Sequence, residues 1–195
     1  MNRSYFVVIE GLDWSGKSTL AREVAARLGA EALATPMRTL PAQVRQGAEA
    51  MCAGDSLARM LFYASTVAAA STFVRARLAE GCPVVMDRYW LSTLSYHLYM
   101  GAPAMLREVE ATLTPPDLTV FLNVSRATRR QRLVDRGELL EHDRMTLQPG
   151  AGEAIAELYR EYRGLQSVGR FLEIEADRLT VLALVDRVVA ALGSS

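Results

Sequence analysis

Short apolar runs alternate along this chain with longer segments in which apolar residues recur every three or four positions. The short runs contain β-branched and aromatic residues, as buried strands do. We expect strands at residues 5–9, 83–86, 118–124 and 171–174, with a weaker one at 31–34. The longer periodic segments predict helices near residues 18–28, 40–53, 56–80, 91–99, 103–113, 125–136, 151–166 and 178–192.

Strands that alternate with helices predict an α/β fold, in which a parallel sheet carries helices on both faces. The length of 195 residues suits one domain. In such folds the functional groups collect at the carboxyl ends of the strands, where the crevice opens. The loops after residues 9, 34 and 86 are therefore the first places to examine for chemistry.

The first of these loops contains the phosphate-binding pattern G-x-x-x-x-G-K-[ST] at residues 11–18. Between a strand and a helix, the amides of such a loop and the helix N-terminus cradle phosphate groups. Lys17 is the only lysine in the chain, and its compact ammonium suits the β- and γ-phosphates of a nucleotide. Ser18 offers a hydroxyl to Mg²⁺. The alternative interpretation is a glycine turn with an exposed lysine.

Asp87 and Arg88 directly follow the predicted strand at residues 83–86. A carboxylate at this edge can hold Mg²⁺ or its water, and a guanidinium can grip a second phosphoryl group. A structural ion pair or a helix cap is the alternative.

Six arginines gather in the segment between residues 126 and 144. Arg129, Arg132 and Arg136 share one face of the predicted helix. They could close over phosphates or lie in solvent, and their spacing does not decide between the two.

Composition limits the possible partners. The formal net charge is zero, which gives no electrostatic footprint for duplex nucleic acid or an acidic membrane. The two cysteines have neither metal-ligand spacing nor the density of a disulfide scaffold, as expected in a reducing cytoplasm. A strand is expected within the first few residues, which leaves no room for a signal peptide, and no uncharged apolar stretch approaches bilayer length. We expect a cytoplasmic protein that binds a small anion, with no nucleic-acid or membrane partner.

Four segments carry a more specific combination: residues 6–19, Asp87-Arg88-Tyr89 with Ser92 and Tyr96, residues 116–124, and residues 132–138. Together they resemble the thymidylate kinase family of P-loop nucleoside monophosphate kinases. The resemblance implies a three-layer P-loop NTPase fold with a five-stranded parallel sheet and a mobile lid at roughly residues 136–150. It also implies a homodimer that uses ATP and Mg²⁺ to phosphorylate a (deoxy)nucleoside 5′-monophosphate to the diphosphate.

The resemblance further implies roles for individual residues. Those expected at the ATP phosphates are Gly11, Trp14, Ser15, Gly16, Lys17, Ser18 and Thr19, and those expected at Mg²⁺ are Ser18 and Asp87. Those expected at the acceptor are Asp13, Arg38, Phe62, Thr66, Arg88, Ser92, Thr93 and Tyr96, with Phe62 stacked on the base. Lys17, Asp13 and Arg88 are the expected catalytic groups. The family places a further catalytic arginine in the phosphate loop or in the lid. Because the loop position here is Trp14, we expect Arg136 or Arg144 to supply that charge.

The chain departs from the family pattern at the base. The family's base-recognising arginine, four residues after the stacking phenylalanine, is Thr66 here, and Thr93 stands where thymidylate enzymes often have asparagine. A thymine carbonyl would lose its charged donor at residue 66. Thymidylate is the leading single candidate, and we hypothesise that another nucleotide, modified or unmodified, is the true acceptor.

Two other functions fit parts of the sequence. A nucleoside kinase would phosphorylate a free 5′-hydroxyl, with Glu10 or Asp87 as general base. A non-catalytic nucleotide-binding protein would keep only the phosphate loop. The paired arginines expected at the acceptor, Arg38 and Arg88, favour a substrate that already bears a phosphate.

Overall fold

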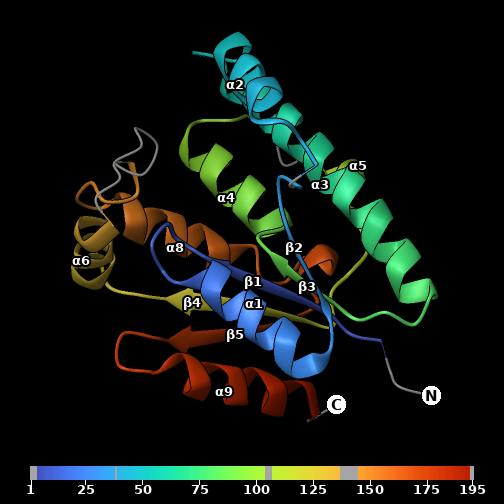
Figure 1. The fold of residues 1–195 in the computed structure, drawn as a ribbon. Helices are drawn as coiled ribbons and strands as arrows, with labels where there is room; N and C mark the ends of the chain where they lie inside the picture. The colour runs from blue at the N-terminus through green and yellow to red at the C-terminus, as the bar shows by residue number, and fades with distance from the viewer. Residues whose placement is uncertain (1–3, 38, 104–106, 137–144, 194–195) are drawn as a thin grey trace.

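A single parallel sheet organises the part of the chain that the computed structural model describes, residues 4–37, 39–103, 107–136 and 145–193 (Figure 1). Its strand order is β2-β3-β1-β4-β5, and every neighbouring pair is parallel. The predicted α/β class and five-stranded sheet are confirmed. The strands are β1 (Phe6–Gly11), β2 (Glu31–Ala34), β3 (Val84–Asp87), β4 (Leu118–Asn123) and β5 (Arg170–Glu175).

The helices follow the predicted order, with two differences in length. They are α1 (Lys17–Leu28), α2 (Ala42–Met51), α3 (Ser56–Ala79), α4 (Trp90–Tyr99), α5 (Arg107–Glu110), α6 (Arg126–Arg136), α8 (Ala151–Glu161) and α9 (Val181–Gly193), with a 3₁₀ turn, η1 (Gln166–Val168). The predicted helix at 103–113 is a single turn within its described part, because Pro115 and Pro116 follow closely and proline cannot continue a helix. The predicted helix at 151–166 ends earlier, at Glu161.

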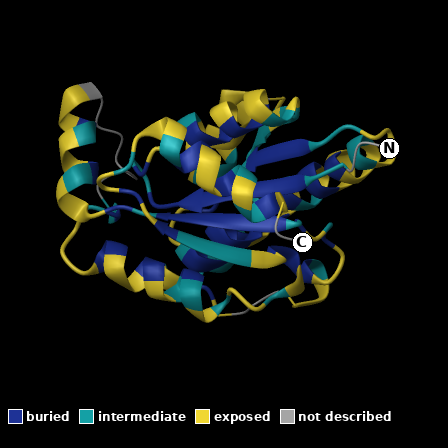
Figure 2. Ribbon diagram, turned by 90° about the horizontal axis from the view of Figure 1, so that it is seen from below, coloured by how far each residue is buried: buried dark blue, intermediate teal, exposed yellow. Residues whose placement is uncertain are grey.

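Strand β1 alternates its side chains between two apolar clusters. Val7 and Ile9 belong to the cluster that includes residues of α1 and α9, whereas Phe6 and Val8 belong to the cluster that includes residues of α3 and α4. All four side chains are buried, as in a parallel sheet covered on both faces. Figure 2 shows buried strands at the centre of the sheet and exposed positions along the outer helices.

Helix α3 has nearly the predicted bounds, Ser56–Ala79 against residues 56–80, and it is strongly apolar. By length and composition alone its 24 residues could cross a membrane, although the helix is not uncharged, since it carries Arg59, Arg75 and Arg77. Core helices share this length and composition, and α3 places a stripe that includes Met60, Ala64, Val67 and Val74 into the apolar core.

Gly169 joins η1 to β5 in a place where no other residue fits. Its φ is +61°, and a Cβ added there would lie 1.9 Å from the carbonyl oxygen of Pro116. The obstructing atom belongs to the backbone, so it cannot move away without displacing the start of β4.

We predict that Gly169→Ala lowers the free energy of unfolding by at least about 2 kcal/mol, because strained backbone and a backbone clash add together. Urea denaturation measures the change. Gly164→Ala is the matched control, since nothing in the described structure lies within 4 Å of its added Cβ. Equal stabilities of the two variants would contradict the prediction.

Candidate active site

The loop between β1 and α1 has the tight geometry that close approach of backbone to an anion requires. Gly16 is the N-cap of α1 with φ +92°, and the Ser15 N–H donates to the Leu12 carbonyl at 3.2 Å. A Cβ on Gly11 would lie 2.6 Å from Ser15 Oγ. Within the described structure that buried hydroxyl has no hydrogen-bond partner, so it is free to meet a phosphate oxygen.

Lys17 is held inside this loop. Its Nζ donates to the Leu12 carbonyl at 3.2 Å and lies 3.8 Å from Asp13 Oδ1. Burial, reinforced by the charge of Arg88, lowers the pKa of Lys17 from 10.5 to about 8. The nearby carboxylates therefore do not fully balance the charge of this ammonium, and an anionic ligand would supply the missing negative charge.

Asp13 links this lysine to Arg88 and Tyr96. Its Oδ1 also accepts a hydrogen bond from Arg88 Nη2, and its Oδ2 accepts one from the Tyr96 hydroxyl at 3.1 Å. The guanidinium of Arg88 lies 5.1 Å from the centroid of the Tyr96 ring. One carboxylate oxygen thus contacts both Lys17 and Arg88.

Arg88 is positioned by a buried acid on the neighbouring strand. Glu10 is fully buried, and its Oε1 accepts the N–H groups of Tyr89 at 2.9 Å and of Ser92 at 3.2 Å. These groups open helix α4, so β1 supplies the cap that α4 lacks in its own sequence. The Ser92 hydroxyl donates to Glu10 Oε2, and Arg88 Nη1 donates to Ser92 Oγ at 3.1 Å. Arg88 itself has φ +67°.

The same contacts correct one expectation. Glu10 was a candidate general base for a nucleoside kinase, but its carboxylate is enclosed by Tyr89, Ser92 and Tyr159. Burial raises the pKa of Glu10, and the side chain is closed to a substrate hydroxyl. Glu10 has a structural role instead.

Asp87 and Ser18 fit a magnesium ion. Asp87 ends β3, and its Oδ1 is buried with no hydrogen-bond partner in the described structure. Ser18 is exposed in the first turn of α1. No three His, Cys, Asp or Glu side chains of the described residues form a metal cluster. Mg²⁺ commonly takes only one or two protein ligands and completes its shell with phosphate and water.

A cavity of about 380 Å³ opens beside Arg88. It brings together most of the residues that the sequence assigned to the acceptor: Asp13, Thr66, Arg88, Ser92, Thr93 and Tyr96. Thr35 and Pro36 also line it, next to Arg38 in sequence. Arg38 itself lies outside the described residues, as do Arg144, the side chain of Arg136 and most of the predicted lid.

Phe62 was expected against the base, and it is not among the residues that line this cavity. Its neighbour Tyr63 lines it instead, with Phe62 packed edge-on against Tyr63 at 5.2 Å between ring centroids. Trp90 is fully buried in the core cluster beside α3 and α4.

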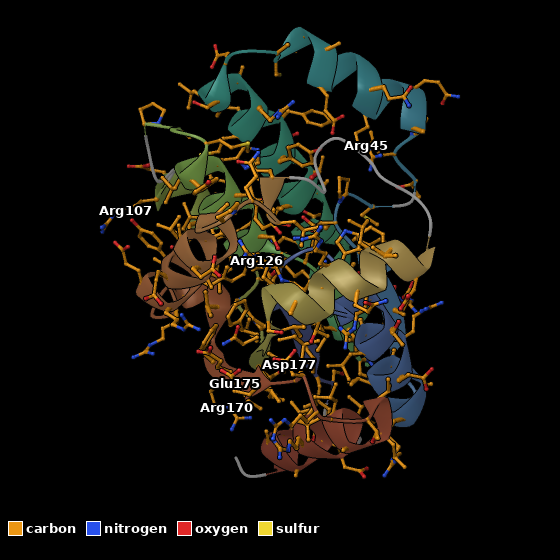
Figure 3. All side chains as sticks on the ribbon, turned by 90° about the vertical axis from the view of Figure 1, so that its left-hand side faces the viewer. Arg45, Arg107, Arg126, Arg170, Glu175 and Asp177 are labelled. Carbon is orange, nitrogen blue, oxygen red and sulfur yellow. The ribbon has the colours of Figure 1, made fainter. Side chains whose placement is uncertain are left out.

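Several lining residues had no signal in the sequence strong enough to select them. They are Arg45 and Glu49 from α2, Arg59 and Tyr63 from α3, His97 from α4, and Met100 and Met145. Figure 3 shows Arg45 on α2, at the opposite end of the molecule from Arg170, Glu175 and Asp177.

The arginine face of α6 packs against the site. Arg132 Nη1 donates to the carbonyls of Trp14 at 3.2 Å and Ser15 at 2.6 Å. These hydrogen bonds connect α6 to the phosphate loop. Arg129 is 2% exposed and donates to the carbonyls of Val124 and Thr146. The helical spacing had left open whether this face lies in solvent, and for these two arginines it does not.

Comparison with known proteins decides the family. The family model described as thymidylate kinase matches residues 9–177. The chain belongs to the thymidylate kinase family. A probable thymidylate kinase from Pyrococcus horikoshii is 29% identical over 203 residues, which covers 94% of this chain and 96% of that protein.

Solved thymidylate kinases have the same fold. The enzyme from Candida albicans has a TM-score of 0.74 at 18% identity, covering 98% of this chain and 92% of its own. That from Ehrlichia chaffeensis has a TM-score of 0.67 at 20% identity, covering 97% and 98%. As a member of the thymidylate kinase family, the chain is a phosphotransferase that acts on a nucleoside monophosphate, and the family implies ATP as the donor.

We predict that the buried Lys17 makes the stability of the nucleotide-free protein rise above pH 8. Below that pH the lysine is charged in both states, and the folded state bears the full cost of burying the charge. Between about pH 8 and pH 10.5 only the unfolded state holds the proton, so the free energy of unfolding rises by up to about 3 kcal/mol. Urea denaturation across this range, compared with Lys17→Met, measures the effect. Tyrosine ionisation affects both proteins equally, so it cancels in the comparison. Parallel curves of unfolding free energy against pH would therefore contradict the prediction.

Proposed function

We propose that the chain transfers the γ-phosphoryl group of ATP, bound with Mg²⁺ at the phosphate loop, to the 5′-phosphate of a nucleotide in the cavity beside Arg88. The observation that carries this proposal is the double contact of Asp13 Oδ1 with Lys17 and Arg88. A cation suited to the donor and a cation suited to the acceptor are held beside the same carboxylate oxygen. Two phosphorylated ligands placed there would meet end to end.

Phosphoryl transfer depends mostly on alignment and charge neutralisation, so no nucleophilic side chain is required. Lys17 and the amides of residues 15–18 hold the donor phosphates, and Arg88 grips the acceptor phosphate. Glu10 keeps Arg88 in place through the start of α4. Mg²⁺, held by Ser18 and Asp87, would neutralise charge on the donor phosphates. Arg136 and Arg144 remain the predicted source of the lid charge.

Thymidylate is the leading candidate acceptor. The relative from Pyrococcus horikoshii is named a probable thymidylate kinase, and the matching family model is described as thymidylate kinase. The hypothesis of a different acceptor rests on Thr66 and Thr93, and the relatives give it no support. The Thr66 hydroxyl donates to the Tyr63 carbonyl at 2.8 Å, so its proton is used within the helix.

Two further expectations stay predictions. The family resemblance implies a homodimer, and the composition favours a cytoplasmic location. Sedimentation would test the first and fractionation of cells the second.

We predict that Lys17→Met and Arg88→Met each lower kcat/KM for the nucleotide pair by about 10²–10³-fold, because each removes a charge aimed at the transferring group or its acceptor. The assay measures ADP and nucleoside diphosphate with ATP and a panel of monophosphates. Arg187→Met is the control, since Arg187 is exposed on α9.

The same assay separates the alternatives. Phosphorylation of free nucleosides in preference to monophosphates would indicate a nucleoside kinase. ATP binding without any product from wild-type protein would indicate a non-catalytic nucleotide-binding protein. Near-normal activity of either variant, with its fold intact by circular dichroism, would refute the assigned role.

A further inference from the structure

Two buried polar atoms in the cavity wall lack partners within the described structure: Arg59 Nε and His97 Nε2. Both residues line the cavity. A buried polar group without a hydrogen bond is costly, so in folded proteins a ligand or water usually satisfies such an atom. His97 is only 4% exposed. These atoms therefore indicate where a ligand makes polar contacts.

The two side chains lie along one seam between α3 and α4. Arg59 Nη1 is 4.0 Å from Met100 Sδ, directly after α4. One turn further along α3, the Tyr63 ring lies 5.3 Å from the His97 ring, centroid to centroid. Arg59 and His97 are thus neighbours at one end of the cavity.

That end is the far end from the phosphate clamp. Arg88 bonds Ser92 near the start of α4, whereas Met100 follows its last turn. Eight residues of helix rise about 12 Å, which suits a nucleotide lying along α4 from its phosphate to its base.

The chemistry of the two atoms is opposite. His97 Nδ1 lies 2.6 Å from the Thr93 carbonyl, and because a carbonyl can only accept, Nδ1 carries the hydrogen. Burial lowers the pKa of His97, and the charge of Arg59 acts in the same direction, so the ring is neutral. Nε2 is then a bare acceptor, while Arg59 Nε is always a donor. Their complement is a ligand edge with an N–H beside a carbonyl.

We propose that Arg59 and His97 read the base of the acceptor, with His97 Nε2 accepting from a ring N–H and Arg59 donating to the adjoining carbonyl. This inference rests on the proposed function, because it takes the cavity to be the acceptor site. The N–H and carbonyl of a dioxopyrimidine edge, as in thymine or uracil, satisfy both atoms. Amino-substituted cytosine has no ring N–H on that edge.

In this proposal Arg59 supplies the charged hydrogen-bond donor to the base that Thr66 does not provide. Arg59 and Thr66 are seven residues apart, two turns along the same face of α3, and both line the cavity. The charged donor stands at residue 59 in this chain, whereas the family pattern has it at the position of residue 66. Tyr63 lies between them and is fastened to α2 by donating its hydroxyl to Glu49, which fixes the wall of the cavity.

The test combines altered residues with an altered base. Acceptors are thymidylate, its N3-methyl derivative, and deoxycytidylate, and the variants are Arg59→Met, His97→Phe and His97→Gln. For wild-type protein we expect thymidylate to exceed the other two in kcat/KM by at least about tenfold. Arg59→Met and His97→Phe should raise KM for thymidylate by about tenfold or more, with kcat and the KM for ATP changing much less. His97→Gln, which keeps an acceptor oxygen, should recover part of the loss.

The decisive comparison is non-additive. N3-methylation removes the N–H that His97 is proposed to read. With the methylated acceptor, kcat/KM of the His97→Phe variant should therefore be nearly the same as that of wild-type protein. If His97 had only a structural role, His97→Phe would lower kcat/KM for both acceptors by the same factor. Arg187→Met and thermal unfolding control for general effects.

The outcomes separate the two proposals. If wild-type protein phosphorylates no nucleoside monophosphate, the proposed function fails. If wild-type protein is active but Arg59→Met and His97→Phe keep its KM and its discrimination against methylated acceptor, only the assignment of Arg59 and His97 is overturned.

Discussion

The arrangement of this site depends on one carboxylate, that of Asp13. Its Oδ1 contacts Lys17 in the phosphate loop and Arg88 at the end of β3, and its Oδ2 accepts from Tyr96 on α4. Two cations held this close would repel each other, so the shared anion allows them to occupy adjoining positions. When phosphates arrive, they supply further negative charge to both cations. Lys17 and Arg88 are therefore held side by side before any ligand binds.

The sequence was sufficient for the sheet and for the geometry of the phosphate loop. Apolar runs mark the three central strands most clearly, because a parallel strand covered on both faces is buried along nearly its whole length. The edge strands β2 and β5 are partly exposed and contain Glu31 and Glu173. The phosphate loop is local in sequence, so its motif predicts its geometry directly. The contacts of Glu10 with α4 were not predictable in this way, since they join residues about eighty positions apart and depend on how β1 and β3 pair.

The end of the cavity between α3 and α4 was the least predictable part. Family resemblance directed attention to Phe62 and Thr66, whereas the cavity wall consists of Arg59, Tyr63 and Thr66 on α3 facing His97 on α4. A helical pattern alone does not say which of several neighbouring side chains faces a partner helix. The tautomer of His97 follows from a backbone carbonyl that the sequence cannot position. For these residues, tertiary packing supplied the information.

The buried guanidinium of Arg129 also restricts a distant position. A Cβ on Gly152 would lie 2.5 Å from Arg129 Nη2, and Arg129 holds the carbonyls of Val124 and Thr146. An alanine at residue 152 would meet that guanidinium unless a shorter side chain replaced residue 129. Among homologues, these two sites are thus expected to vary together, so that a long basic residue at one accompanies glycine at the other.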